Sequence, residues 1–258
     1  MSQKPTIVFV PGAWHNISTW EKVTAPLEAQ QYKCICVPLP STMGNPSTTF
    51  LEDLDAVRNV ILAEIAQGHD VVVVVHSYGG LVGSSAIKSL TKKPQSVSPS
   101  PTQPTGHVLG LAMMATGFAA TGISFIDHVG GKPPPFWKAD TESGFAVIVA
   151  DARELFYHDL PEEEGNLFVS RLEKQALKVL MEGGEHVYSG WKDVPVWYLM
   201  TTDDRTFPVE AQTHLVQLAR GGGGDVTMRE VESSHSPMLS KPKETVEFIL
   251  EAVAALER

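Results

Sequence analysis

A single serine stands where a buried strand is predicted to turn sharply into a helix. Residues 71–75 are five consecutive valines, and β-branched side chains favour a strand inside a sheet. Ser77 follows them, and Gly79 and Gly80 then open an apolar helical pattern. A serine at the apex of a strand–turn–helix is typical of a nucleophile elbow, which exposes the hydroxyl for attack on a carbonyl. Ser77 is therefore the candidate nucleophile.

The elbow has one departure from the usual pattern and one competing interpretation. Elbows usually have glycine two residues before the serine, where this chain has Val75, so either the elbow must be slightly relaxed or the neighbouring strand must leave room for a branched side chain. A strand followed by glycines and a helix also describes a dinucleotide-binding loop. Aligned on Gly80 and Gly83, that loop has Tyr78 in place of its first glycine, and no acidic residue follows about 20 positions later. The elbow is the favoured interpretation.

A serine hydroxyl needs a base to take its proton and an acid to orient that base. His235 lies in a polar loop between a strand predicted at 226–231 and the last predicted helix, and it is the candidate base. Asp203 and Asp204 follow the strand predicted at 194–200, and either carboxylate could orient the histidine. One or both of them could instead simply cap the helix that follows.

Strands and helices alternate along the regions that must position these residues. Such alternation is typical of an α/β fold, with a mostly parallel sheet and helices on both faces. The carboxyl ends of parallel strands share one edge, so we expect the serine, the acid and the histidine to meet there. The predicted strands are 6–10, 33–37, 71–75, 107–114, 194–200 and 226–231, and the predicted helices are 19–31, 49–68, the segment after Ser77, 209–219 and 244–256.

The alternation stops over residues 117–190, which we expect to form a lid inserted over the carboxyl edge of a core made of 1–116 and 191–258. Stretches near 144–151 and 167–181 are predicted to be helical, and the Pro/Ser/Thr-rich stretch 92–106 is predicted to be a surface loop. Aromatic side chains in the lid favour a small apolar or aromatic substrate, although they could simply pack the lid's own core. They are Phe118, Phe125, Phe136, Trp137, Phe145, Phe156 and Tyr157.

Composition limits the classes of function. The 258 residues suit one large domain, and a net charge of −10 disfavours nucleic acids and anionic membranes as partners. No apolar run approaches the roughly 20 residues of a membrane span, and the N-terminal residues lack a secretion signal, so a cytoplasmic monomer or homodimer is expected. Cys34 and Cys36 alternate on a predicted strand and are expected to stay reduced. No residue cluster has metal-ligand spacing, so neither metal nor cofactor is expected.

Four segments of the chain resemble the α/β-hydrolases, in the branch of plant methyl-ester hydrolases, hydroxynitrile lyases and microbial relatives. The resemblance implies a triad of Ser77, His235 and Asp204, with Asp203 as the alternative acid. It also implies an oxyanion hole formed by the backbone N–H groups of Ala13 and Tyr78. The four segments are 8–15, 75–80, 198–208 and 235–242.

The same resemblance favours hydrolysis over cyanide release. Hydroxynitrile lyases of this branch have lysine after the catalytic histidine and threonine in the oxyanion turn, where this chain has Ser236 and Gly12. We therefore expect a serine hydrolase of a small carboxylic ester or lactone that works through an acyl-enzyme. The alternatives are a hydrolase-derived receptor with little turnover, and a lyase or carbon–carbon bond hydrolase on the same triad. The residues expected to contact the substrate are Gly12, Trp14, Trp137, Tyr157 and His158.

Overall fold

The structure, a computed structural model, describes residues 3–92 and 106–258. The predicted surface loop at 92–106 lies almost entirely outside these ranges. The main sheet has six strands in the order β2-β1-β3-β4-β8-β9, and every neighbouring pair is parallel. This confirms the predicted parallel sheet. The strands are β1 (Thr6–Val10), β2 (Cys34–Cys36), β3 (Val71–His76), β4 (Val108–Met114), β8 (Val196–Thr201) and β9 (Val226–Val231).

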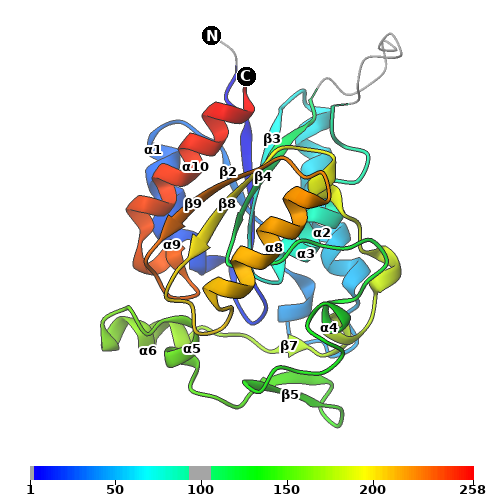
Figure 1. The fold of residues 1–258 in the computed structure, drawn as a ribbon, viewed down its shortest axis with the longest axis vertical. Coiled ribbons are helices and arrows are strands. Elements are labelled where there is room, and N and C mark those ends of the chain that lie inside the picture. The colour runs from blue at the N-terminus through cyan, green and yellow to red at the C-terminus, as the bar shows by residue number, and fades with distance from the viewer. Residues whose placement is uncertain (1–2, 93–105) are drawn as a thin grey trace.

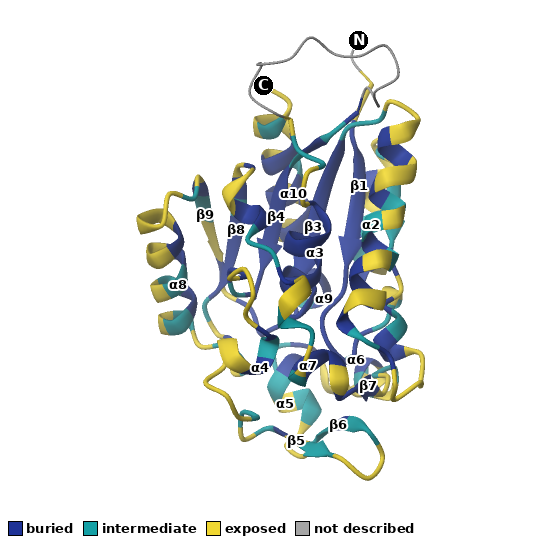
Figure 2. Cartoon of the chain, turned by 90° about the vertical axis from the view of Figure 1, so that its right-hand side faces the viewer, coloured by how far each residue is buried: buried dark blue, intermediate teal, exposed yellow. Residues whose placement is uncertain are grey.

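Helices cover both faces of this sheet (Figure 1). One face carries α1 (Glu21–Ala29), α9 (Pro237–Ser240) and α10 (Pro242–Leu256), and the other carries α2 (Phe50–Ala66), α3 (Gly79–Ala86) and α8 (Val209–Gly221). The central strands are buried between the two layers, as Figure 2 shows. The described ranges also contain four short 3-10 helices: Ile17–Trp20, Pro40–Thr42, Gly184–His186 and Gly190–Lys192.

Local sequence explains why α2 begins where it does. Thr49 accepts a hydrogen bond from the backbone of Glu52, whose carboxylate in turn accepts one from the backbone of Thr49. This capping box satisfies two backbone groups at the helix start. The apolar residues at helical spacing, Leu54, Val57, Ile61 and Ile65, are all buried.

The sheet places the loops that carry two groups of predicted site residues side by side. β1 pairs with β3, with Val10 opposite Val75, so the turns that follow these strands emerge next to each other. β2 lies on one side of β1 and β3 on the other, which makes this position the topological switch point of the sheet. Ligands of open α/β sheets bind in the crevice at such a point.

Residues 117–190, called the insertion below, lie at the carboxyl edge of the main sheet (Figure 1). A three-stranded sheet in the order β5-β6-β7 is paired antiparallel there. The elements are α4 (Phe125–His128), β5 (Trp137–Asp140), β6 (Phe145–Ile148), α5 (Ala152–Phe156), α6 (Glu162–Ser170), β7 (Gln175–Ala176) and α7 (Lys178–Met181). The division of the chain into a core and a lid stays a prediction.

One helix prediction in the insertion is wrong, and a second is correct only at its two ends. Residues 145–148 form β6, because they pair with β5 through a turn in which Gly144 has a φ of 74°. The helix expected over 167–181 is interrupted, because Gln175 and Ala176 pair with β6. Both strands are specified by partners elsewhere in the chain rather than by local periodicity. No helix of the described ranges is long and apolar enough to cross a membrane.

Candidate active site

Ser77 occupies a strained turn between β3 and α3. Its φ is 50°, a left-handed conformation that is uncommon for a residue with a side chain. A Cβ on Gly79 would lie 2.5 Å from the carbonyl oxygen of Pro11, and one on Gly80 would overlap Thr116. Only glycines therefore let the helix start so close to the turn after β1. The predicted elbow is present in the structure.

The room for Val75 comes from the helix of the elbow. A Cβ on Gly83 would lie 2.5 Å from Cγ1 of Val75, so the missing side chain at Gly83 accommodates the branched one on the strand. In this chain, the glycine is at the facing position on α3 and not on the strand.

His235 and Asp204 are joined by a hydrogen bond of 2.8 Å between Nδ1 and Oδ2. The Asp204 carboxylate also accepts hydrogen bonds from the Thr201 hydroxyl at 2.9 Å and from the backbone N–H groups of Thr206 and Phe207 at 2.8 Å. Its side chain has no exposed surface. These bonds fix the carboxylate so that Nδ1 of His235 donates to it and Nε2 is left as an acceptor.

Asp203 faces away from this arrangement. Its side chain is 57% exposed, and its Oδ2 atom accepts a hydrogen bond of 3.0 Å from Nε2 of His158. Of the two adjacent carboxylates, the structure thus brings only Asp204 to His235.

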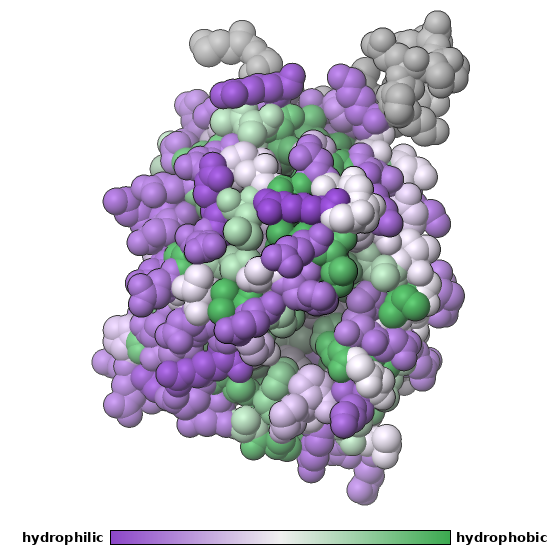
Figure 3. All heavy atoms as spheres, in the orientation of Figure 1, coloured by the Kyte–Doolittle hydropathy of each residue, from purple (hydrophilic) through white to green (hydrophobic). Residues whose placement is uncertain are grey.

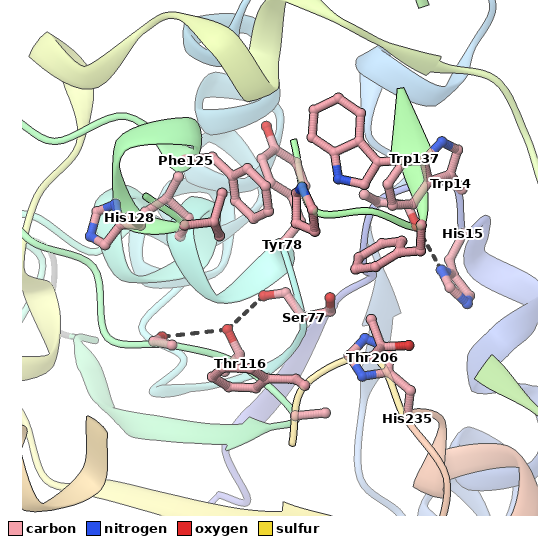
Figure 4. A pocket seen from close by; sticks show the side chains of 18 of the residues that line it. Trp14, His15, Ser77, Tyr78, Thr116, Phe125, His128, Trp137, Thr206 and His235 are labelled. Carbon is pink, nitrogen blue, oxygen red and sulfur yellow. Dashed lines mark hydrogen bonds between the residues drawn. The ribbon is translucent and has the colours of Figure 1, made fainter. Parts of the chain in front are cut away.

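Ser77 and His235 line the same cavity (Figure 4). No hydrogen bond joins the two side chains in the part of the chain that the structure describes. Catalytic hydrogen bonds of this kind are often long before a substrate binds.

Two further histidines lie behind the site. His76 is fully buried, and its Nε2 donates a hydrogen bond of 2.8 Å to the backbone carbonyl of His235. Nδ1 of His15 donates at 2.7 Å to the carbonyl of Ala13, and its Nε2 accepts from the Tyr157 hydroxyl at 2.9 Å. Burial lowers the pKa of His15 to about 4 and holds the pKa of His76 well below its usual range, so both rings are neutral near pH 7.

The backbone N–H groups of Ala13 and Tyr78 are available to a substrate. Both residues line the cavity, and neither N–H is used in a hydrogen bond within residues 3–92 and 106–258. Gly12 does not line the cavity. A Cβ there would lie 2.9 Å from Nδ1 of His76 and 3.0 Å from Cβ of Ser77, so Gly12 permits close packing of the turn on the elbow.

A buried carboxylate holds the side chain of Tyr78. The phenol donates a hydrogen bond of 2.9 Å to Oδ2 of Asp53 on α2, and Oδ1 accepts one of 2.9 Å from the backbone of Ser41. Burial raises the pKa of Asp53 to about 6, although both hydrogen bonds act in the opposite direction. Sequence reasoning missed this contact, because nothing in the pattern of α2 distinguishes Asp53 from a surface acid.

The cavity has a volume of about 330 Å³, within the size range of small-molecule sites. No aspartate, glutamate, lysine or arginine of the described chain lines it. In the space-filling view, apolar side chains gather around a hollow near α4, above the β5–β6 hairpin (Figure 3). The aromatic lining residues are Trp14, Tyr78, Phe118, Phe125, Phe136, Trp137, Phe156 and Phe207.

The structure places some of the expected substrate contacts elsewhere. Trp14 and Trp137 line the cavity, whereas Tyr157 and His158 do not, and Phe145 does not. Tyr157 is buried against His15, and His158 is directed at Asp203.

Apart from Phe118, the cavity wall made by residues 115–119 was not expected from the sequence. Its signal was available, since these residues directly follow β4, the neighbour of β3. In the described ranges, no group of three or more His, Cys, Asp or Glu side chains could hold a metal ion.

Known proteins resemble this chain in fold and in sequence along nearly its whole length. The sequence model of the Alpha/beta hydrolase family matches residues 7–248. Alpha/beta hydrolase nvfD of Aspergillus novofumigatus is 29% identical over 252 residues, which cover 96% of each chain. Methylesterase 1 of Arabidopsis thaliana is 24% identical, over 96% of this chain and 95% of its own. The crystal structure of polyneuridine aldehyde esterase has a TM-score of 0.74 at 20% identity and covers 97% of this chain and 99% of that chain. The chain therefore belongs to the alpha/beta hydrolase family, in a branch that resembles the plant methylesterases.

Proposed function

We propose that this protein is a serine hydrolase that cleaves a small, neutral carboxylic ester or lactone through Ser77, His235 and Asp204. The observation that carries the proposal is His235, which is hydrogen-bonded to the buried carboxylate of Asp204 and lines the same cavity as Ser77. Relatives named as methylesterases support an ester as the substrate.

In the proposed reaction, the hydroxyl of Ser77 attacks the substrate carbonyl while Nε2 of His235 takes its proton. The tetrahedral oxyanion accepts hydrogen bonds from the backbone N–H groups of Ala13 and Tyr78, and such donors contribute several kcal/mol to the transition state. His235 then gives the proton to the leaving alkoxide, and Asp204 stabilises the imidazolium. Water, activated by His235, hydrolyses the acyl-enzyme and restores Ser77.

The substrate class follows from what the cavity can bind. Hydrogen bonds to the protein already use the polar side-chain groups of Thr116, Tyr78 and His15. A charged substrate would lose its hydration without finding a partner of opposite charge on the lining, which is costly. The aromatic walls instead favour an apolar or aromatic substrate, and selection would depend on shape.

The first prediction concerns Ser77→Ala, compared with wild type and with Ser84→Ala as a matched control. Ser84 is a buried serine of α3 whose hydroxyl has no hydrogen-bond partner among the described residues. On a panel of chromogenic acyl esters and lactones, Ser77→Ala should lose about 10³-fold or more in kcat/KM, because no acyl-enzyme can form. Ser84→Ala should retain wild-type activity.

A fluorophosphonate probe tests the same assignment without a known substrate. Mass spectrometry should find the adduct on Ser77 in wild type and in Ser84→Ala, and no adduct in Ser77→Ala. If wild type does not react with the probe and is no more active than Ser77→Ala on the panel, the hydrolase is excluded and a receptor is favoured. Probe labelling of Ser77 without turnover of esters or lactones would favour carbon–carbon cleavage or lyase chemistry on the same triad.

A further inference from the structure

One short stretch of the insertion contacts three separate loops that carry the active-site groups. This stretch, residues 154–159, is called the clamp segment and covers the end of α5 and the three residues after it. The three loops are the oxyanion turn (11–15), the acid loop (202–208) and the histidine loop (232–236). They follow β1, β8 and β9, so they are far apart in sequence.

The acid loop is held along most of its length. Nε2 of His158 donates to Asp203 at 3.0 Å, the Thr206 hydroxyl donates to the backbone carbonyl of Leu155 at 3.0 Å, and Arg205 pairs with Glu154. Asp203 and Thr206 lie on either side of the buried carboxylate at position 204. The loop backbone near that carboxylate is therefore fixed from the insertion.

The histidine loop is held at the residue before the catalytic imidazole. Oδ2 of Asp159 accepts a hydrogen bond of 2.8 Å from the backbone N–H of Ser234, and the Ser234 hydroxyl donates to the carbonyl of Phe156 at 2.9 Å. Ser234 has no exposed surface. Both its backbone and its side chain are thus bound by the clamp segment, immediately before His235.

The oxyanion turn is held through a buried relay. The Tyr157 hydroxyl donates to Nε2 of His15, and Nδ1 of His15 donates to the carbonyl of Ala13. Tyr157 is 1% exposed. A neutral His15 is required for this relay, because only a ring with a free lone pair on Nε2 can accept from the phenol.

We propose that the clamp segment is a positioning element of the active site. Asp159 acts through Ser234 to hold His235, and Tyr157 acts through His15 to hold the oxyanion turn. Neither Asp159 nor Tyr157 lines the cavity, so their effect is on geometry and not on substrate contact. This inference rests on the proposed hydrolase function, because a positioning effect on kcat requires turnover by the triad.

The main test compares Asp159→Ala with Asp159→Asn. Removal of the carboxylate frees the backbone of Ser234, and a misplacement of about 1 Å can cost about 10²-fold in rate, so kcat should fall by about 10- to 100-fold while KM stays nearly constant. Asparagine keeps one oxygen that can accept from Ser234, so Asp159→Asn should restore most of the lost kcat.

A matched control is Asp140→Ala. Asp140 is also a carboxylate of the insertion that accepts backbone N–H groups, from Glu142 and Ser143, but it lies at the β5–β6 hairpin and does not line the cavity. Its removal should leave kcat and KM unchanged. Tyr157→Phe removes only one hydroxyl and should lower kcat by about 3- to 10-fold at constant KM, as expected for one lost neutral hydrogen bond. This variant keeps the test decisive if Asp159→Ala does not fold.

Hydrogen–deuterium exchange separates the clamp from the proposed chemistry. The Ser234 amide should exchange faster in Asp159→Ala than in wild type, and at the wild-type rate in Asp140→Ala, whether or not the protein is an esterase. A wild type without turnover would defeat the proposed function but leave this readout intact. A rise in KM at constant kcat, equal losses in Asp159→Ala and Asp140→Ala, or unchanged Ser234 exchange would each overturn the positioning role.

Discussion

Two adjacent aspartates show how the fold separates residues of identical chemistry. The side chain of Asp204 is fully buried and accepts hydrogen bonds from His235, from Thr201 at the end of β8 and from two backbone N–H groups of its own loop. Asp203 is mostly exposed and accepts from His158. The strand pattern alone places both at the end of a strand and cannot distinguish them, because the choice depends on the direction in which the loop turns after β8. Only the resemblance to the α/β-hydrolases favoured Asp204.

The second prediction follows from this difference. Asp204→Asn should lower kcat by about 10⁴-fold, because an amide can favour the wrong tautomer of His235 and cannot stabilise its charged form. Asp203→Asn should change kcat by no more than about five-fold, as expected from losing a half-exposed pair. Steady-state kinetics on the preferred substrate measures both. A larger loss of kcat in Asp203→Asn than in Asp204→Asn would reverse the assignment of the acid.

At the scale of elements, α2 reaches the active site through one side chain. Asp53 links this helix to the backbone of Ser41 and to the phenol of Tyr78, a residue that lines the cavity. The pKa of Asp53 is raised by burial to about 6, above the value near 4 of an unfolded chain. Between these two values the folded protein binds the proton more tightly than the unfolded one does.

The third prediction is the pH dependence that this shift produces. Because the pKa of Asp53 is higher in the folded protein, its contribution to the free energy of unfolding is largest below about pH 4. This contribution, about 3 kcal/mol in total, is lost as the pH rises to about 6. Asp53→Asn removes this term, so its free energy of unfolding should rise relative to wild type over the same interval. Urea denaturation of both proteins at pH 4, 5, 6 and 7 measures the difference. A constant difference across this range would show that Asp53 ionises normally.

At the scale of the whole molecule, the sequence predicted the elements of the fold that have a local sequence pattern. The valines before Ser77 can form only a buried strand, and the capping box at Thr49 marks the start of α2. The order of Ser77, the acid and His235 then followed from the alternation of strands and helices. The elbow, the parallel sheet and the choice of His235 needed no knowledge of distant contacts.

Contacts between remote segments explain what sequence could not predict. Residues 144–151 were predicted to be helical, but residues 145–148 pair with β5 across a hairpin turn and with the more distant β7, so strand pairing and not local periodicity determines their conformation. Tyr157 and His158 were expected at the substrate because their segment belongs to the insertion over the site. Their actual partners, His15 and Asp203, are more than 40 residues away along the chain.

The uncharged cavity wall also determines how a hydrolysis cycle would end. Cleavage of an ester leaves a carboxylic acid that is ionised at pH 7, and a buried carboxylate without a cation nearby is unstable. The acyl product should therefore be expelled by its own charge, which drives turnover forward. We predict that the free acid inhibits the enzyme at least about 10-fold more weakly than a neutral methyl ketone of the same carbon skeleton, since a 1.4 kcal/mol difference in binding suffices. Competitive inhibition constants measure this, and equal values would mean that the released anion finds a partner at the site.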